Sequence, residues 1–459
     1  MTTEVADVFA VQQSERTSLW ADFSWTCIGN AVYAAGQFAM LVLLTKLVRP
    51  ELVGQYALGL ALVYPVMMLT NMQLRSVMTS DHRRQAQFGH YLGLRLLATA
   101  VAVVFIFAAT QVLRYPRELM EVVLLVAAAY GVETISDMYY ARLQLHDRMA
   151  EISKSLIVRA LLSVFGLGVV VYFTRSIFWG VMAIVLARAA VLFGYDICAR
   201  THGIGEKPQW FSANQALAPR FEPRKQLALL WRSLPLGIVV LLTTLNASIP
   251  SFFIKHGLGE RDLGIFSAIS LTISIGNMAV VSLGQAAFTR LSRAYASGRF
   301  ATFGSLLSKL LICGAGIGVC GMIISKLAGH EILTILFRPE YAERSDLLPW
   351  IMAAGAILFM AQFLGYGMTA AGFYHSQVIL NVLGNISLMA ACYFLVARQG
   401  LLGAILAMLI SAIVQLAASA IILFLGLRGK AHERPQEFEV IMAPSMHVPF
   451  AESEKIHGD

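Results

Sequence analysis

Long apolar segments alternate with short polar stretches along most of this chain. A helix needs roughly 20 mostly apolar residues to cross the hydrocarbon core of a bilayer. Twelve segments reach that length, and they cover residues 19–45, 55–78, 91–113, 119–141, 153–173, 177–199, 229–254, 264–289, 303–326, 347–371, 377–397 and 402–427. The pattern predicts an all-α integral membrane protein of twelve transmembrane helices.

The polar stretches between these segments predict the domain organisation. Residues 1–18 form an N-terminal tail and residues 19–199 a first bundle of six helices. Residues 200–228 form a basic linker, residues 229–427 a second six-helix bundle, and residues 428–459 a C-terminal tail. Both tails and the linker are expected on the cytoplasmic side.

A short phrase occurs once in each predicted bundle. Residues 50–59 read PELVGQYALG and residues 260–269 read ERDLGIFSAI, so Gly54 and Gly264 are 210 positions apart, as are Tyr56 and Phe266. Both copies lie where the first outer loop of a bundle enters its second helix, where Gly allows a tight turn. Six helices per bundle is an even number, so both bundles run the same way. We expect them to be related by a pseudo-twofold axis along the membrane normal, as in parallel-repeat transporters.

Composition excludes an ordinary soluble protein. Hydrophobic residues make up 58% of the chain and charged residues 14%, whereas soluble domains have about 45–50% and about 25%. The net charge of +8 could indicate nucleic-acid binding, but the basic residues alternate with apolar spans, so no nucleic-acid partner is expected. The five Cys form no C-x-x-C pair, and neither a metal site nor a cofactor is predicted.

The distribution of Lys and Arg predicts the orientation. With a cytoplasmic N-terminus, 23 of the 35 basic residues lie at inner ends of spans and 11 at outer ends. This bias indicates that both termini are cytoplasmic. Arg75, Arg95 and Arg159 count among the inner-end residues, and Arg188 alone is expected in the middle of a span.

Charged residues inside the membrane are functional candidates because their burial is expensive. Arg188 could bind a diphosphate, since its planar guanidinium binds two oxygens at once. Alternatively, it forms a structural pair with a neighbouring carboxylate. Glu133 and Asp137 lie four residues apart on one helix face and could relay a proton or sodium ion, because two nearby carboxylates in low dielectric cannot both be charged cheaply. They could instead neutralise Arg142, Arg159 or Arg188, or lie at the cytoplasmic end of the helix, where water reaches Asp137.

Polar residues also recur at helical spacing inside several spans. They either join helices by hydrogen bonds or line a wet cavity. The candidates for a substrate cavity, besides Arg188, are Tyr33, Gln37, Asn71, Arg75, Arg159, Asn277, Gln285, Gln362 and Asn381.

Two motifs resemble those of Wzx-type polysaccharide flippases in the multidrug/oligosaccharidyl-lipid/polysaccharide exporter superfamily. That family shows Leu-Gly-Pro-Glu-x-x-Gly-x-Tyr between helices 1 and 2, and here Pro50, Glu51, Gly54 and Tyr56 match it, with Arg49 in place of Gly. Before helix 10 the family has Phe-Gly-x-x-Tyr. The run Phe337, Pro339, Glu340 and Tyr341 fits, with Arg338 in place of Gly. Together with the twelve-helix layout and the repeat, the resemblance covers about residues 15–428.

The resemblance implies a protein of the bacterial inner membrane that moves a polyprenyl-diphosphate-linked oligosaccharide to the periplasmic face. The translocated oligosaccharide would be used to build surface polysaccharides such as lipopolysaccharide O-antigen or exopolysaccharide. It implies two bundles around a V-shaped cationic cavity, with alternating access driven by an ion gradient. Membrane lipids, the lipid-linked glycan and, downstream, a polysaccharide polymerase and a chain-length regulator are the implied partners. In keeping with this, the sequence has no G-x-x-x-x-G-K-[ST] motif for ATP.

Two alternatives remain at this level. One is a multidrug/ion antiporter of the same superfamily. The other is a membrane enzyme, such as a polysaccharide polymerase or a glycosyltransferase. A polymerase would be expected to have a large periplasmic loop, whereas the longest loop here is the cytoplasmic one at 200–226. The common glycosyltransferases carry D-x-D, which is absent from this sequence. We therefore expect a transporter rather than an enzyme.

Overall fold

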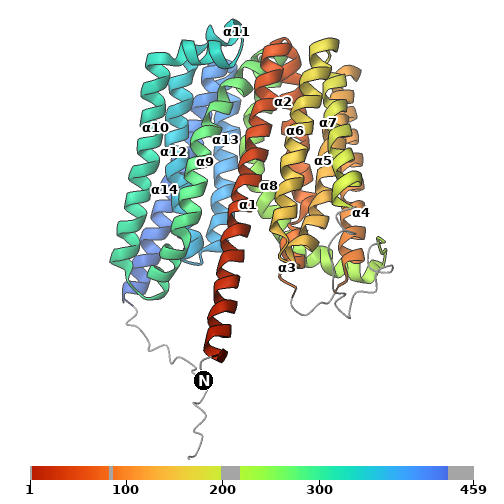
Figure 1. Cartoon of the computed structure of the whole chain (residues 1–459). Coiled ribbons are helices and arrows are strands. Elements are labelled where there is room, and N and C mark those ends of the chain that lie inside the picture. The colour runs from red at the N-terminus through yellow and green to blue at the C-terminus, as the bar shows by residue number, and fades with distance from the viewer. Residues whose placement is uncertain (1–2, 82–85, 198–217, 433–459) are drawn as a thin grey trace, which may run out of the picture.

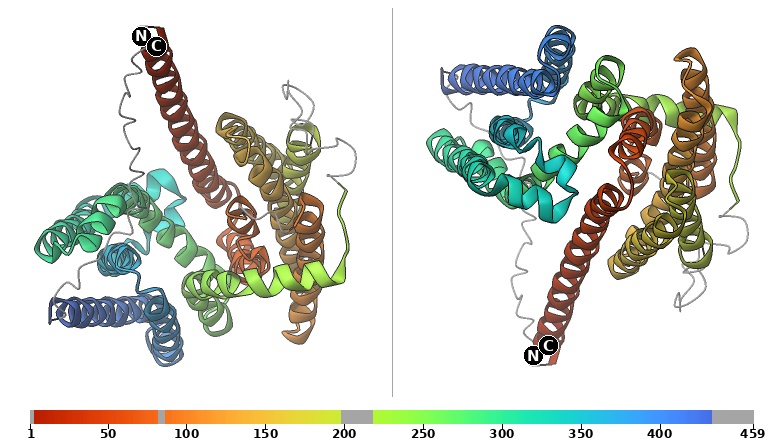
Figure 2. Two further views of the ribbon diagram at one scale, coloured as in Figure 1. Left: turned by 90° about the horizontal axis from the view of Figure 1, so that it is seen from below. Right: turned by 90° about the horizontal axis from the view of Figure 1, so that it is seen from above.

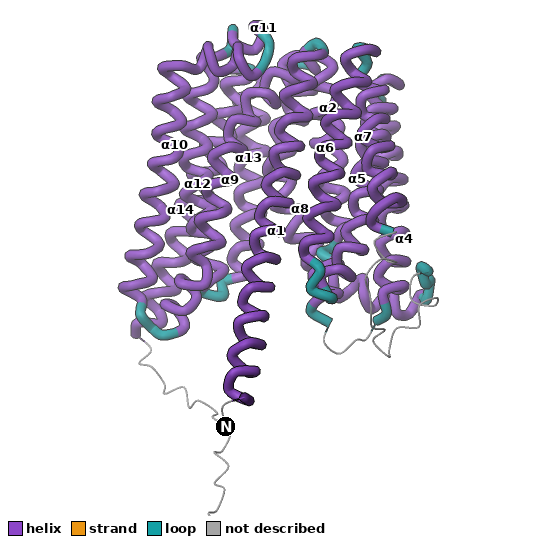
Figure 3. Tube along the Cα trace, viewed as in Figure 1, coloured by secondary structure: helices purple, strands orange, loops and turns teal. Residues whose placement is uncertain are grey.

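The structure is a computed structural model that describes residues 3–81, 86–197 and 218–432. Helices and short connecting loops make up this part of the chain, which contains no strand (Figure 3). Twelve helical stretches within it are long and apolar enough to cross a membrane. The predicted all-α class and the number of spans are confirmed.

The helices form two lobes. The N-lobe contains α1 (Thr3–Leu47), α2 (Pro50–Asn71), α3 (Leu74–Thr79), α4 (Phe88–Val112), α5 (Arg117–Gln144), α6 (Met149–Thr174) and α7 (Ile177–Val191), which continues as a π-helical segment, Leu192–Asp196. The C-lobe contains α8 (Pro223–Gly257), α9 (Glu260–Ala296), α10 (Phe300–Leu336), α11 (Pro339–Ala342), α12 (Leu348–Ala370), α13 (Tyr374–Gln399) and α14 (Leu401–His432). A 3₁₀ turn, Ser345–Leu347, leads into α12.

Several helices extend beyond the predicted apolar spans. The helix α1 begins at Thr3, so residues 3–18, expected as a separate tail, continue the first helix. Helix α8 begins at Pro223, and α9 and α10 each run for 37 residues. In these helices the backbone hydrogen bonds continue into the polar residues that flank the apolar span, because such hydrogen bonds do not require hydrophobic side chains. Most of the predicted linker and C-terminal tail, residues 198–217 and 433–459, lies outside the described residues.

The two lobes approach each other at one end of the molecule and diverge toward the other (Figures 1 and 2). We call the end with Pro50 and Glu260, at the top of Figure 1, the upper end. The lower end contains the turn between Ala296 and Phe300 and the last residue of α14. Helix α8 of the C-lobe also contacts α2 of the N-lobe: a Cβ built on Gly237 would lie 2.6 Å from the carbonyl oxygen of Leu69.

The repeated phrase forms the contact between the lobes at the upper end. A Cβ built on Gly54 would lie 1.9 Å from the carbonyl oxygen of Glu260, and one built on Gly264 would lie 2.0 Å from that of Pro50. Real Cβ atoms do not approach oxygen so closely, so only Gly fits at either position. The contact is reciprocal, as a twofold interface requires. Tyr56 and Phe266, the aromatic residues of the two phrases, are both buried in the core beside it.

Candidate functional site

Charged and aromatic side chains gather around one face of α5 in the N-lobe. Tyr130, Glu133, Asp137 and Tyr140 follow one another at helical spacing along this face. Four arginines from neighbouring helices surround them: Arg75 of α3, Arg95 of α4, Arg159 of α6 and Arg188 of α7. We refer to these arginines, together with Glu133, Asp137 and Asp196, as the arginine cluster.

Arg188 joins three helices through Glu133. Its Nη1 lies 2.5 Å from Oε2 of Glu133 and 3.3 Å from the carbonyl oxygen of Ala129, and its side chain is 2% exposed. Its guanidinium carbon lies 5.0 Å from the ring centroid of Tyr130, a cation–π distance. The other carboxylate oxygen of Glu133 accepts a hydrogen bond from the hydroxyl of Tyr33 on α1. Both interpretations of Arg188 from the sequence, structural pair and anion-binding residue, are compatible with this geometry.

Helix α1 contributes two predicted cavity residues to this network. Gln37 donates its amide to the hydroxyl of Tyr33 at 2.7 Å, one helical turn away. Because Tyr33 in turn donates to Glu133, α1 is connected to α5 and α7 by polar contacts. The space between Tyr33, Gln37, Arg159 and Arg188 is too narrow for a water molecule. This part of the cluster is therefore closed in the state observed.

A second ion pair lies deeper in the lobe. Arg159 Nη2 is 2.9 Å from Oδ2 of Asp196, and these side chains are 1% and 0% exposed. Ser155 donates to the other oxygen of Asp196 at 2.5 Å. Sequence analysis did not single out Asp196, although a carboxylate in the last turn of an apolar span was a usable signal. The π-helical segment that ends α7 contains this residue, and such segments often occur at functional sites.

Asp137 is shared between two arginines. Its Oδ1 lies 3.3 Å from Nη1 of Arg75, and its Oδ2 lies 3.6 Å from Nη2 of Arg95. Arg95 also donates to the side-chain oxygen of Asn71 at 3.3 Å. The structure thus brings Asn71 and Arg75 together with Asp137, which the sequence could not show.

The predicted polar stripe through Asn71 and Arg75 does not lie on one continuous helix. Met72 and Gln73 have positive φ values of 48° and 50°, and they separate α2 from α3. Residues other than Gly rarely adopt the left-handed backbone conformation. At Met72 and Gln73 this conformation ends α2 and starts α3 in a new direction. Arg75 reaches both Asp137 and Gln144 from this redirected turn.

Arg188, expected alone in the middle of a span, is not the only buried arginine well inside a helix of the described chain. Arg95 and Arg159, which we had counted among inner-end charges, lie inside α4 and α6 and are 0% and 1% exposed. Each has a carboxylate partner on another helix, which makes its burial tolerable. Sequence position cannot reveal such partners, because they come from segments far apart in the chain.

The arginine cluster has one positive charge in excess, with four guanidinium groups and three carboxylates. Several guanidinium nitrogens have no hydrogen-bond partner among the described residues: Arg95 Nε and Nη1, Arg159 Nε and Arg188 Nε. Buried donors are normally satisfied, so these are open to a further acceptor. Arg75, Glu133 and Asp137 remain 31%, 22% and 24% exposed, so the cluster is accessible along one side. The arrangement suits an anion with several oxygens.

The predicted cavity residues of the C-lobe do not join this cluster. Within the described chain, no hydrogen bond or ion pair links Asn277, Gln285, Gln362 or Asn381 to the arginine cluster. Asn277 is half-buried and its Oδ1 lacks a partner, whereas Gln285 is exposed.

A polar contact between helices of the C-lobe involves Asn385, which lies one helical turn after Asn381 on α13. Asn385 donates to the carbonyl oxygen of Leu242 at 2.8 Å and accepts from Asn246 at 3.3 Å, which joins α13 to α8. This contact is of the helix-joining kind.

The two motifs that carry the family resemblance meet at the upper end. Arg49 and Arg338, the two positions that depart from the family pattern, line one pocket together with Arg175. Arg338 donates to the carbonyl oxygen of Lys46 at 3.0 Å, and Arg175 donates to that of Leu47 at 2.9 Å. They cap the C-terminal end of α1, where unpaired carbonyl groups favour cations.

The second motif also contributes to the core of the upper end. Tyr341 is fully buried, and its ring centroid lies 5.7 Å from that of Phe337. Burial raises the pKa of Tyr341 above its ordinary value, so the hydroxyl stays neutral. The motif therefore has a structural role at the junction of the lobes.

Two lobes of membrane-length helices, like-oriented and with a charged cluster buried inside, define a multi-pass membrane transporter fold. The fold is similar to the lipid II flippase MurJ in an inward closed conformation, with a TM-score of 0.70 and 10% identity over 88% of this chain and 89% of that one. It is also similar to an inward-facing multidrug resistance MATE family transporter of the MOP superfamily, with a TM-score of 0.66 and 12% identity over 90% of this chain and 99% of that one.

The chain belongs to the polysaccharide biosynthesis protein family, whose model matches residues 19–295. A relative in Staphylococcus aureus, the capsular polysaccharide biosynthesis protein CapF, is 24% identical over 397 residues, which cover 86% of this chain and 96% of that protein. The family and the fold confirm the resemblance predicted from the two motifs.

Proposed function

We propose that this protein is a flippase for a polyprenyl-diphosphate-linked oligosaccharide in surface polysaccharide biosynthesis. The arginine cluster is the observation that carries the proposal. It offers excess positive charge and free guanidinium donors inside a membrane-spanning lobe. Family membership and the MOP-type fold support the same function.

In this proposal the diphosphate replaces internal carboxylates as the partner of the arginines. Arg188 and Arg159 bind diphosphate oxygens, because a guanidinium presents two parallel donors and stays charged. Arg75, which is the most exposed of the four, makes the first contact. Tyr33, Gln37 and Asn71 supply neutral hydrogen bonds to the sugar-bearing end.

Glu133 couples transport to an ion gradient. Its carboxylate holds Arg188 and Tyr33 when charged. Binding of a proton or sodium ion to Glu133 weakens both contacts, which frees Arg188 for the substrate and loosens α1. An ion that binds one state better than the other shifts the balance between them.

The lobes alternate access by pivoting at the upper end, where Gly54 and Gly264 hold them together. The excess of basic residues at the lower end supports a cytoplasmic position for that end, with both termini inside. The substrate then enters from the cytoplasmic leaflet and leaves toward the periplasm. A polysaccharide polymerase and a chain-length regulator would act on it next.

The test is translocation of a polyprenyl-diphosphate-linked oligosaccharide in proteoliposomes, measured by access of an added glycosidase. We expect Arg188→Gln to reduce the rate roughly 10- to 100-fold, since a charge-assisted hydrogen bond is worth about 1.5–3 kcal/mol. Arg117→Gln, at an exposed pair on α5, is the control and should leave the rate unchanged. Absence of translocation by the wild-type protein, with efflux of cationic drugs instead, would refute the flippase and indicate a multidrug/ion antiporter.

A further inference from the structure

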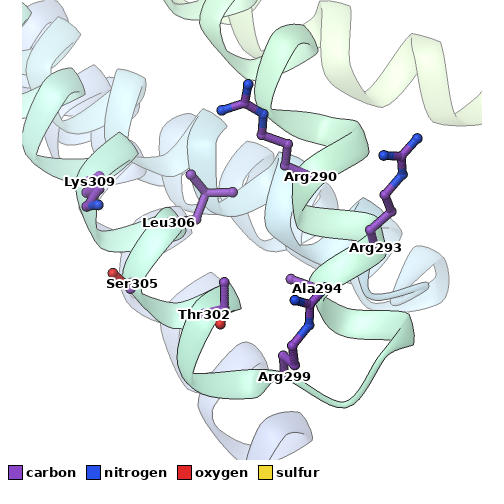
Figure 4. Close-up of a pocket in the computed structure, with 8 residues that line it drawn as sticks. All are labelled: Arg290, Arg293, Ala294, Arg299, Thr302, Ser305, Leu306 and Lys309. Carbon is purple, nitrogen blue, oxygen red and sulfur yellow. The ribbon is translucent and has the colours of Figure 1, made fainter.

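The lower end of the C-lobe contains a basic pocket that lies outside the arginine cluster. The pocket, of about 340 Å³, lies between the end of α9 and the start of α10. Its basic side chains, Arg290 and Arg293 on α9, Arg299 in the turn and Lys309 on α10, come from both helices and the turn between them (Figure 4). Thr302 and Ser305 add hydroxyl groups to its lining. Its volume falls in the range of small-molecule sites, roughly 300–1,000 Å³.

These four cations have no carboxylate partner in the part of the chain that the structure describes. None of them forms an ion pair there, and Arg299 donates only to the hydroxyl of Ser297 at 3.0 Å. The sequence explains this, since it contains no Asp or Glu between Asp262 and Glu331. Four cations around one pocket, with no carboxylate partner among the described residues, attract an anion with several oxygens, such as a phosphate group.

An apolar pocket lies further along the same two helices. It has a volume of about 660 Å³, and its lining includes Thr272 and Gly276 of α9, Cys313 and Gly316 of α10 and Phe359 of α12. No atom lies within 4 Å of a Cβ built on Gly316, so the groove is open at that point.

The two pockets occupy one face of the helix pair. On α10 the lining residues Thr302, Leu306, Lys309, Cys313, Gly316 and Cys320 recur every three or four positions. Such spacing keeps them on one side of a helix. On α9, Gly276 and Ala294 are 18 residues apart, which is five full turns, so they too share a face. The basic pocket and the apolar pocket therefore follow one another along the same side of α10.

A soluble anion would use the basic pocket and gain nothing from the apolar groove. A lipid uses both, with its phosphate at the membrane surface and its chain within the hydrocarbon core. From Thr302 to Ile324 the stripe on α10 extends about 33 Å at 1.5 Å per residue. This length is comparable to the hydrocarbon core of a bilayer, about 30 Å.

We propose that the α9/α10 face is a binding site for an anionic membrane lipid, one whose phosphate headgroup carries a net negative charge. Arg290, Arg293, Arg299 and Lys309 bind the phosphate, and the groove beside Cys313 and Gly316 holds the hydrocarbon chain. The site rests on C-lobe residues alone and does not depend on the arginine cluster or on the flippase function.

The test is lipid binding to the full-length protein in nanodiscs of neutral phosphatidylcholine, followed by native mass spectrometry. Polyprenyl diphosphate, phosphatidic acid and inorganic diphosphate are added in separate titrations. We expect saturable binding of at least one of the two lipids, and the lipid that binds more tightly identifies the source. The variant Arg290→Gln/Arg293→Gln/Arg299→Gln/Lys309→Gln should weaken this binding at least roughly 10-fold.

The control for charge is Arg114→Gln/Arg344→Gln/Arg398→Gln, which removes exposed cations from the upper end. It should bind lipid as the wild-type protein does. The control for the groove compares Gly316→Leu with Gly304→Leu. Both glycines lie on α10 with no atom near a built Cβ, but only Gly316 lines the groove. We expect Gly316→Leu alone to weaken binding of the lipids.

Three results would overturn the proposal. In the first, the wild-type protein and the four-residue lower-end variant bind lipid equally well. In the second, the upper-end control loses as much lipid binding as the lower-end variant does. In the third, inorganic diphosphate binds as tightly as the lipids. Because translocation is measured separately, a failure here leaves the flippase proposal standing. Size-exclusion elution and thermal midpoints of each variant confirm that it is folded.

Discussion

Gly54 and Gly264 pack backbone to backbone across the two lobes, each against the residue four positions before its counterpart. Gly54 faces the carbonyl group of Glu260, and Gly264 faces that of Pro50. A polar contact lies beside them, since Gln55 donates to Glu260 at 2.9 Å. The repeat that the sequence shows as two separate phrases is thus one symmetric contact in the folded protein.

Gly54→Ala should separate the lobes at the upper end. The added methyl group requires a backbone shift of more than 1 Å to reach an ordinary contact distance from the Glu260 oxygen. Overpacking of this kind costs about 1–3 kcal/mol. We expect a lower thermal midpoint and loss of surface polysaccharide when the variant is the only copy in the cell. Gly168→Ala, where the nearest atom would be 3.5 Å away, is the matched control and should behave like the wild-type protein.

A double-mutant cycle at Arg188 and Glu133 distinguishes a structural from a functional role. Arg188→Ala alone leaves Glu133 without its cation and should destabilise the protein. Breaking a fully buried ion pair costs about 3–5 kcal/mol. The cost here is expected to be smaller, because Glu133 is 22% exposed and solvent screens its charge. Arg188→Ala/Glu133→Ala removes both charges and should recover much of the thermal midpoint. If Arg188 binds substrate, translocation stays absent in the double variant. Recovery of translocation in the double variant would show that Arg188 has only a structural role.

The pair of Arg159 and Asp196 should be the most sensitive to disruption. Both side chains are buried, so Arg159→Ala is expected to destabilise the protein by about 3–5 kcal/mol. Unfolding in detergent measures the loss. The comparison is Arg117→Ala, whose pair with Glu121 is exposed and is worth about 0–1 kcal/mol. Similar losses in the two variants would mean that burial of Arg159 is not maintained in solution.

Glu133 and Asp137 should differ in their contribution to ion coupling. Asp137 forms ion pairs with two arginines, whereas Glu133 forms one with Arg188 and accepts a hydrogen bond from Tyr33. Glu133→Gln is therefore expected to abolish the dependence of translocation on pH or sodium, while Asp137→Asn lowers the rate and keeps that dependence. Proteoliposomes with imposed ion gradients provide the measurement. The reverse pattern would assign coupling to Asp137.

The sequence by itself determined the class, the number of spans and the repeat. A bilayer imposes a fixed length of apolar helix, and this length is readable along the chain without any partner segment. The same reasoning located Arg188, Glu133 and Asp137 as expensive charges inside spans. It counted Arg95 and Arg159 at the inner ends of their spans by distance from the span end, and it named only Arg159 of the two as a candidate for the substrate cavity.

Only the tertiary structure decided which charges meet. Asp196 became the partner of Arg159 through the π-helical segment at the end of α7, and Asp137 became shared through the break between α2 and α3. These contacts join segments tens of residues apart, and their geometry depends on local backbone conformations that hydrophobic periodicity does not encode. The basic and apolar pockets of α9 and α10 became one face for the same reason, since a groove exists only between helices that are packed together.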